Sequence, residues 1–254
     1  MDKRKIVFIT GATSGFGKAI AEKFASQNTD CIITGRRAEK LHTIAENFQT
    51  VFGVKILPLV FDVRNREEVF EAVKNLPAGW QHIDVLVNNA GLALGRESFE
   101  KASMDDWDIM FDTNVKGLLN VSRAIIPLMI KNKNGHIINI GSTAAKEVYP
   151  NGNIYCATKH SVDAISKAQR IDLLSHHIKV TAIHPGAAET EFSIVRFKGD
   201  EEKAKSVYQG YEPLHAEDIA EICYYCATLP PHVCINDLVV TCTAQANSYL
   251  IQKG

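Results

Sequence analysis

The strongest constraint on the fold is a regular alternation of short apolar runs with amphipathic segments along the whole chain of 254 residues. Most of the runs are continuously apolar, as strands buried on both faces of a parallel sheet are. The segments between them repeat apolar residues with the 3.6-residue period of a helix. Such alternation builds right-handed βαβ units, so we expect an α/β fold with a doubly wound parallel sheet. Strands are predicted over Lys5–Thr10, Cys31–Gly35, Lys55–Phe61, Ile83–Asn88, His136–Ser142, Ile178–His184 and Leu238–Thr241, and clear helices over Gly17–Ser26, Ala38–Phe48, Asp105–Lys131 and Tyr155–Ser175.

The chain contains no linker, internal repeat or low-complexity tract, which predicts a single domain over residues 1–254. One long segment, Ala187–Gly210, separates a strand from the next clear helix. Its second half is polar and charged, with few apolar groups to offset the entropy of ordering. We therefore interpret residues 187–210 as a mobile lid rather than a core element.

Composition excludes several classes of function. The formal net charge is -1, so no overall charge draws the protein to nucleic acid or to an anionic membrane. No apolar run approaches the ~20 residues of a membrane span. The segment Met1–Lys5 leads directly into the first strand without the apolar stretch of a signal peptide, and a cytoplasmic location is expected.

The six cysteines predict no metal site. Cys223 and Cys226 are the only close pair, and neither a second pair nor histidines at ligand spacing accompany them. Residues three apart on a helix share a face, and a free cysteine packs as a small hydrophobe. Reduced thiols in the core are favoured over a redox or metal role.

A glycine-rich turn follows the first predicted strand and leads into the first helix. It reads Thr10-Gly-Ala-Thr-Ser-Gly-Phe-Gly17. Glycines there let the backbone turn tightly and approach a pyrophosphate, whose charge lies against the helix N-terminus. We predict a dinucleotide cofactor held by Gly11, Ala12, Thr13, Ser14, Gly15, Phe16 and Gly17.

The end of the second strand indicates which dinucleotide binds. Enzymes that use NAD carry an acidic residue there for the ribose 2′-hydroxyl, but this chain has Arg36 and Arg37. Guanidinium groups form charge-assisted hydrogen bonds with a 2′-phosphate, each contributing on the order of 1.5–3 kcal/mol. The alternative, two arginines facing solvent, puts cations at a helix N-terminus without an anion. The cofactor is therefore predicted to be NADP.

Polar residues also follow the third and fourth strands. Asp62 and Val63 follow the third strand at the expected level of the adenine, and Asn88-Asn-Ala-Gly91 ends the fourth at the reversal of strand order. Each segment alone could be a structural turn. Their position at successive carboxyl ends of strands favours cofactor contacts by Asp62, Val63, Asn89, Ala90 and Gly91.

Three residues near the fifth strand have the chemistry of carbonyl reduction. Ser142 ends that strand, and Tyr155 and Lys159 lie four apart on one face of the following helix. A phenol can donate the proton that an alkoxide needs after hydride transfer. Its pKa, normally near ~10, should fall beside an ammonium and an oxidised nicotinamide. Ser142 would donate a hydrogen bond to the substrate oxygen.

Together these motifs resemble the short-chain dehydrogenase/reductase family over essentially the whole chain. The resemblance implies a Rossmann-type sheet of about seven strands, with Ser142, Tyr155 and Lys159 as the catalytic trio. It makes Asn114 a fourth catalytic residue, which kinks its helix and anchors a water in a proton relay. Pro185 and Gly186 match the segment along the nicotinamide, and Thr190 matches a hydroxyl that binds the carboxamide. Tetramers that pair the two longest helices are also implied.

A narrower resemblance is to the NADP-dependent 3-hydroxy acid dehydrogenases, also described as serine or L-allo-threonine dehydrogenases. It rests on Thr34–Leu41, Asn88–Gly95, Ile137–Thr143 and Glu191–Asp200. It implies a small-molecule substrate such as serine, L-allo-threonine or 3-hydroxypropionate, or malonic semialdehyde in the reverse direction. The substrate carboxylate needs a cation, for which Arg196 and Lys198 are candidates and Lys146 is a further one.

Other interpretations stay open. Residues 144–149, His184 and residues 187–190 depart from the expected pattern where the substrate should lie. A broad carbonyl reductase of the same chemistry is therefore one alternative. A redox-sensing protein that binds NADP without turnover is another, although such proteins normally lose the tyrosine or the lysine of the site.

Overall fold

The computed structural model describes residues 4–254 as one seven-stranded sheet in which every paired strand is parallel. The strand order is β3-β2-β1-β4-β5-β6-β7, so the chain winds outward from β1 in one direction and then in the other. This confirms the predicted doubly wound sheet. The strands are β1 (Ile6–Ile9), β2 (Asp30–Gly35), β3 (Ile56–Val60), β4 (Val85–Asn88), β5 (His136–Ile140), β6 (Lys179–Pro185) and β7 (Asp237–Val240).

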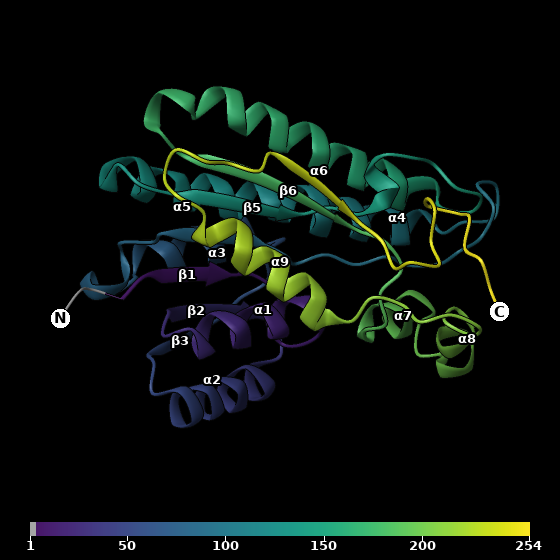
Figure 1. The fold of residues 1–254 in the computed structure, drawn as a ribbon, viewed down its shortest axis with the longest axis horizontal. Coiled ribbons are helices and arrows are strands. Elements are labelled where there is room, and N and C mark those ends of the chain that lie inside the picture. Colours follow the sequence, from purple (N-terminus) through teal and green to yellow (C-terminus); the bar gives the residue numbers. More distant parts are fainter. Residues whose placement is uncertain (1–3) are drawn as a thin grey trace.

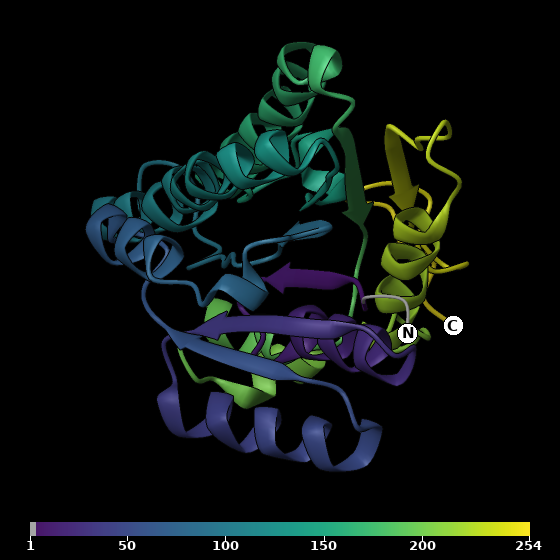
Figure 2. The same ribbon diagram turned by 90° about the vertical axis from the view of Figure 1, so that its left-hand side faces the viewer.

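Helices cover both faces of the sheet (Figures 1 and 2). Successive residues of β1 point to opposite faces. Val7 and Ile9 pack under the helices of residues 15–26, 38–52 and 216–228, and Phe8 packs under those of residues 66–74 and 118–132. Two apolar cores therefore sandwich the sheet, which explains why its central strands read as continuous apolar runs. The helices that build the layers are α1 (Gly15–Ser26), α2 (Ala38–Phe52), α3 (Arg66–Lys74), α4 (Met104–Phe111), α5 (Leu118–Asn132), α6 (Asn153–Asp172) and α9 (Ala216–Thr228).

The predicted helical segment Asp105–Lys131 is helical throughout in the structure, but it is not one regular α-helix. It divides into α4 and α5, joined by a π-helical segment over Asp112–Gly117. Side-chain caps set the start of two helices. At α4, the Ser103 side chain accepts a hydrogen bond from the backbone of Asp106, and at α3 the Asn65 side chain accepts one from the backbone of Glu68. The remaining predicted helices and strands differ from the structure by a few residues at their ends.

The segment interpreted as a lid is not free of regular structure. It contains two short helices, α7 (Glu191–Arg196) and α8 (Glu201–Ser206), capped by Thr190 and Asp200. They lie beyond one end of the sheet, beside the C-terminal tail (Figure 1), and the backbone of Gly254 donates to Gly210. The low apolar content of the segment predicted no regular structure, but hydrogen bonds to the two capping side chains stabilise these short helices. Mobility of this lid stays a prediction.

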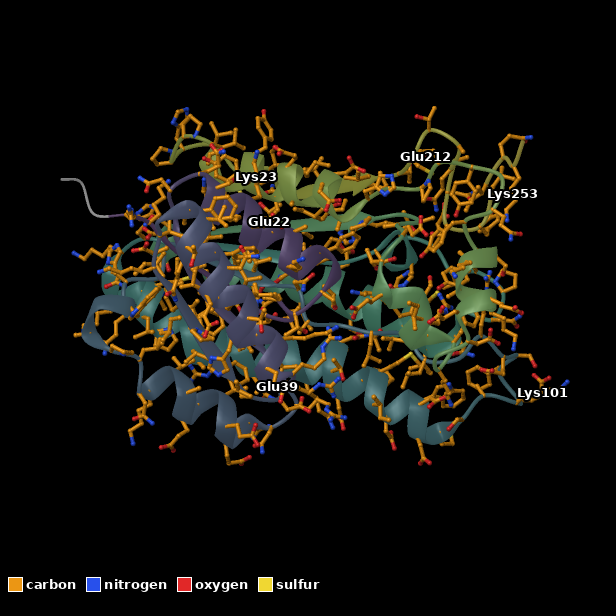
Figure 3. The ribbon with its side chains drawn as sticks, turned by 90° about the horizontal axis from the view of Figure 1, so that it is seen from below. Glu22, Lys23, Glu39, Lys101, Glu212 and Lys253 are labelled. Atoms are coloured by element: carbon orange, nitrogen blue, oxygen red, sulfur yellow. The ribbon has the colours of Figure 1, made fainter. Side chains whose placement is uncertain are left out.

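Charged side chains cover the outside of the fold. Lys101 and Lys253 point away from the ribbon at its periphery (Figure 3). Over residues 4–254, no helix has both the length and the apolar composition needed to cross a bilayer. The six cysteines are free thiols, and Cys223 and Cys226 are buried against the sheet as expected of core residues.

Candidate active site

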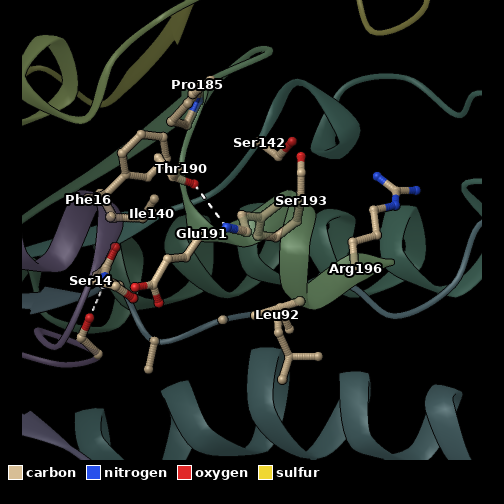
Figure 4. Close-up of a pocket in the computed structure, with 18 of the residues that line it drawn as sticks. Ser14, Phe16, Leu92, Ile140, Ser142, Pro185, Thr190, Glu191, Ser193 and Arg196 are labelled. Carbon is tan, nitrogen blue, oxygen red and sulfur yellow. Dashed lines mark hydrogen bonds between the residues drawn. The ribbon is translucent and has the colours of Figure 1, made fainter. Parts of the chain in front are cut away.

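A cleft of about 470 Å³ opens at the carboxyl ends of the strands. It lies where the strand order reverses between β1 and β4, the usual place for a ligand in a doubly wound sheet. Asn89 ties the two sides together, because its side-chain amide donates to the backbone oxygens of Thr10 (2.8 Å) and Gly11 (3.2 Å). Figure 4 shows Ser14 at one end of this cleft and Arg196 at the other.

The glycine-rich turn forms one wall of the cleft. Gly11 and Gly15 adopt φ values of +68° and +49°, which L side chains rarely take. A Cβ at Gly17 would overlap the Gly11 carbonyl and the Asn89 amide. Glycine is required at these positions for different reasons: backbone conformation at the first two and close packing at the third.

Arg37 is tied to the turn and to the lid at the same time. Its guanidinium donates to the hydroxyls of Thr13 (2.8 Å) and Ser14 (2.8 Å) and to the carboxylate of Glu191 in α7 (2.9 Å). Arg36 is more exposed and lies 3.7 Å from Asp62. Both arginines line the cleft, at the position predicted to bind a 2′-phosphate.

The predicted residues after β3 and β4 converge on the same cleft. Val63, Ala90 and Gly91 line it together with Asp62 and Asn89. Asn88 is buried instead and donates to Ser122 and Asn139, which ties β4 to α5 and β5.

Ser142, Tyr155 and Lys159 meet at the inner end of the cleft. Ser142 follows β5. Its hydroxyl oxygen accepts a hydrogen bond from the backbone N–H of Ala144, so the serine caps the short helix over residues 143–145. Tyr155 and Lys159 come from the first two turns of α6. The Lys159 ammonium donates to the Ile140 carbonyl at 3.0 Å and lies 5.9 Å from the centre of the Tyr155 ring.

Burial dominates the electrostatics of these groups. It raises the pKa of Tyr155 above its ordinary value, and the nearby Ser142 hydroxyl partly opposes that rise. Burial also lowers the pKa of Lys159 to about 8. The predicted fall in the pKa of Tyr155 therefore does not arise from the residues of the protein alone.

Asn114 lies in the π-helical segment between α4 and α5 and does not line the cleft. Its amide donates to the Leu92 carbonyl (2.8 Å) and to the Thr158 hydroxyl (3.0 Å), and its oxygen accepts from the Leu92 backbone. These bonds fix the loop after β4 against α6. The expected irregularity of the helix at Asn114 is present.

Arg196 is the lid cation that faces the reacting groups. Its guanidinium carbon lies 5.5 Å from the Tyr155 ring centre and 5.8 Å from that of Tyr149, and Nη1 donates to the Tyr149 hydroxyl. Arg196 forms no ion pair within residues 4–254. Lys198 instead pairs with Asp106 (2.8 Å), and Lys146 pairs with Asp163 and Asp237. Neither lysine lines the cleft.

Most of the predicted site residues line the cleft, including Phe16, Pro185, Gly186 and Thr190. Ala12 does not, because its side chain is buried in the core and its backbone bonds to Thr34. Gly17 is also absent from the lining and acts through packing. Sequence reasoning missed several lining residues. Leu92 and Arg96 lie in the loop between β4 and α4. The placement of the others depends on how the lid and the segments that follow it fold back over the cleft: Glu191, Phe192, Ser193, Tyr208, Tyr211 and Gln245.

Comparison with known proteins gives consistent matches. Residues 5–201 match the short chain dehydrogenase family. The NADP-dependent 3-hydroxy acid dehydrogenase YdfG of Salmonella typhi is 50% identical over 232 residues, covering 91% of this chain and 92% of that protein. Sulfoacetaldehyde reductase of Chromohalobacter salexigens is 46% identical over 241 residues, or 94% of each protein.

Solved structures agree with these sequence matches. The closed form of a serine dehydrogenase complexed with NADP⁺ has a TM-score of 0.91 and 46% identity, covering 98% of this chain and 99% of that one. Serine dehydrogenase from Escherichia coli has a TM-score of 0.82 and 41% identity, covering 95% and 99%. Because these matches extend over most of its length, the chain belongs to the short-chain dehydrogenase family.

Proposed function

We propose that this protein oxidises the 3-hydroxyl group of a small hydroxy acid, or reduces the corresponding semialdehyde, with NADP as its cofactor. The observation that carries the proposal is the position of Arg196, a cation without an ion pair in residues 4–254, over the ring of Tyr155. The protein is an oxidoreductase of the short-chain dehydrogenase family that acts on CH–OH groups.

The cleft has the features that NADP requires. Gly11, Gly15 and Gly17 leave room for a pyrophosphate beside the N-terminus of α1. Arg36 and Arg37 would hold the 2′-phosphate. Pro185, Gly186 and Thr190 would hold the nicotinamide end, and a bound nicotinamide supplies or accepts the hydride.

Within the chain, Tyr155 would move the proton at the substrate oxygen. Its phenol is held protonated by burial, so it can donate to an alkoxide as the alkoxide forms. Lys159, with a pKa of about 8, is largely an ammonium at neutral pH and favours the phenolate left behind. The Ser142 hydroxyl would donate a hydrogen bond to the same oxygen. Asn114 supports this geometry by fixing the neighbouring loop.

Arg196 would bind the anionic end of the substrate, because a guanidinium forms paired hydrogen bonds with planar or tetrahedral anions. The names of two relatives, a 3-hydroxy acid dehydrogenase and a sulfoacetaldehyde reductase, both describe small anionic substrates. The simplest class of substrate that would reach both residues has a hydroxyl or carbonyl oxygen at Tyr155 and, close to the reacting carbon, a carboxylate at Arg196.

A broad carbonyl reductase is the second candidate. Leu92, Tyr149 and Phe192 line the cleft with apolar surface that a neutral ketone could contact. A protein that binds NADP without turnover is disfavoured, because Ser142, Tyr155 and Lys159 are all in place.

A substrate panel tests the proposal. Catalytic efficiencies are measured from NADPH absorbance for serine, L-allo-threonine and 3-hydroxypropionate and for neutral alcohols of the same size, in wild type and Arg196→Ala. We expect the ratio of acid to neutral alcohol to fall about 10- to 100-fold, as the loss of a charged hydrogen bond predicts. Lys205→Ala, a lid cation outside the cleft, is the matched control. A ratio that does not change, with ketones as the better substrates, would favour the carbonyl reductase.

A further inference from the structure

A buried histidine outside the cleft contacts the backbone of the proposed catalytic serine. His184, near the end of β6, has a fully buried side chain, and its Nδ1 lies 3.2 Å from the Ser142 carbonyl oxygen. The ring is packed tightly against the neighbouring backbone, because a Cβ at Gly141 would overlap it. The imidazole that contacts the Ser142 carbonyl therefore has little room to move.

The far side of the same ring faces charged groups. His184 Nε2 lies 3.6 Å from carboxylate oxygens of both Asp163 and Asp237, and it has no hydrogen-bond partner within residues 4–254. The Lys146 ammonium bonds to the same two carboxylates, at 2.9 and 2.7 Å. We refer to His184, Lys146, Asp163 and Asp237 as the His184 cluster. Lys146 balances the charge of these carboxylates together with Lys167, which pairs with Asp163 at 2.7 Å.

Hydrogen-bond chemistry determines the tautomer of this ring. A carbonyl oxygen only accepts, so Nδ1 must carry a proton for the contact with Ser142 to be a hydrogen bond. Burial and the Lys146 ammonium lower the pKa of His184 by more than Asp237 and Asp163 raise it, which favours the neutral imidazole. A neutral ring with its proton on Nδ1 has none on Nε2. The Ser142 carbonyl then accepts from Nδ1 and also from the backbone of Ala145 (2.8 Å).

We propose that His184 is a positioning residue for Ser142, donating from Nδ1 to its carbonyl while the His184 cluster holds the ring in place. The inference rests on the proposed function, in which Ser142 binds the substrate oxygen. A hydroxyl that must meet a developing alkoxide is effective only when its backbone is held still, since small misplacements reduce catalysis strongly.

Two variants of His184 with side chains of similar shape test the hydrogen bond from Nδ1 to the Ser142 carbonyl. Asparagine places an amide N–H where the imidazole Nδ1 lies, whereas leucine has the same branching without a donor. We expect His184→Leu to lower kcat at least tenfold on whichever substrate the wild type converts, with the Kd for NADPH changed less than twofold. His184→Asn should recover most of kcat. A folded leucine variant with kcat within twofold of wild type, or an asparagine variant no better than leucine, would overturn the proposal.

A second measurement needs neither turnover nor a folded leucine variant. Nitrogen-15 NMR of the wild-type imidazoles, with His184 assigned by its loss in His184→Asn, should show a neutral ring protonated at Nδ1. A ring protonated only at Nε2 would overturn the proposal even if hydroxy-acid activity is found. The expected tautomer would support the proposal even if that activity is absent. Treatment with EDTA should change neither kcat nor the His184 signals, and a response restored by a divalent metal would contradict the role of Lys146.

Discussion

The Glu191 carboxylate accepts a hydrogen bond of 2.9 Å from the Arg37 guanidinium, which joins the lid to the end of β2. Lys40 pairs with the same carboxylate at 3.3 Å. A 2′-phosphate bound to Arg37 has to share or replace this carboxylate partner. We therefore expect binding of NADP and closure of the predicted lid to be linked through the Glu191 side chain.

Replacement of Glu191 by glutamine should strengthen NADP binding. The amide keeps the size of the side chain but removes the negative charge next to the phosphate position. We expect the Kd for NADP⁺ to fall severalfold and that for NAD⁺ to change little, as measured by isothermal titration calorimetry. Hydrogen exchange over residues 187–210 should be faster in the variant without cofactor, because the Arg37 contact is weakened. Weaker binding of NADP⁺ would show that Glu191 supports the phosphate site.

Arg36→Ala should weaken binding of NADP relative to NAD more selectively than Arg37→Ala. Within residues 4–254, the ion pair of Arg36 is with Asp62, at 3.7 Å. Arg37 instead donates to the hydroxyls of Thr13 and Ser14 in the turn that both cofactors need. We expect Arg36→Ala to raise the KM for NADP about tenfold and leave that for NAD within twofold. The double variant should raise the KM for NADP further. Equal losses for both cofactors would assign the arginines a structural role.

Tyr155→Phe should abolish turnover while NADPH still binds, because the ring packs as before and only the proton donor is missing. Lys159→Ala should impair both, since it removes an ammonium that donates to Ile140 and faces the cofactor cleft. Steady-state rates and NADPH fluorescence titrations distinguish these effects. Retention of more than a tenth of the wild-type rate by Tyr155→Phe would rule out its acid–base role.

Asp163 should make stability depend on pH in the acidic range. Although burial opposes ionisation, hydrogen bonds from Lys167 and Lys146 lower its pKa from 3.8 to about 2. The unfolded chain then binds more protons between about pH 4 and pH 2, so this contribution is full above pH 4 and is lost as the pH falls. The stability difference between wild type and Asp163→Asn, from urea unfolding, should shrink over that window. A difference independent of pH would contradict the ion pairing.

Exposed apolar side chains on α5 and α6 should form a subunit interface. Leu119, Ile171 and Leu174 are 43%, 75% and 72% exposed, on and next to the two helices expected to pair in a tetramer. We expect a tetrameric mass by light scattering and its dissociation by Ile171→Asp. Val51→Asp, on the exposed side of α2, is the control. A monomeric wild type at micromolar concentration would contradict the expected tetramer.

Local sequence determined the parts of this protein that depend on neighbours along the chain. Apolar runs and helical periods predicted the sheet and the layers, and the spacing of Gly11, Gly15 and Gly17 predicted the phosphate turn. Tyr155 and Lys159 share a face because one turn of helix separates them. These relationships are short in sequence, so propensity and spacing are sufficient to predict them.

Only the tertiary structure decided which distant charges meet. Glu191 reaches Arg37 across 154 residues, and Lys146 reaches Asp237 across 91. The first contact links the lid to the cofactor site, and the second removes Lys146 from the candidates for carboxylate binding. The side-chain partners of Asn114, Leu92 and Thr158, likewise lie 22 and 44 residues away in the sequence. Ion pairs between exposed side chains leave no periodic pattern in a sequence, because a charge is compatible with many partners until the backbone brings one of them within reach.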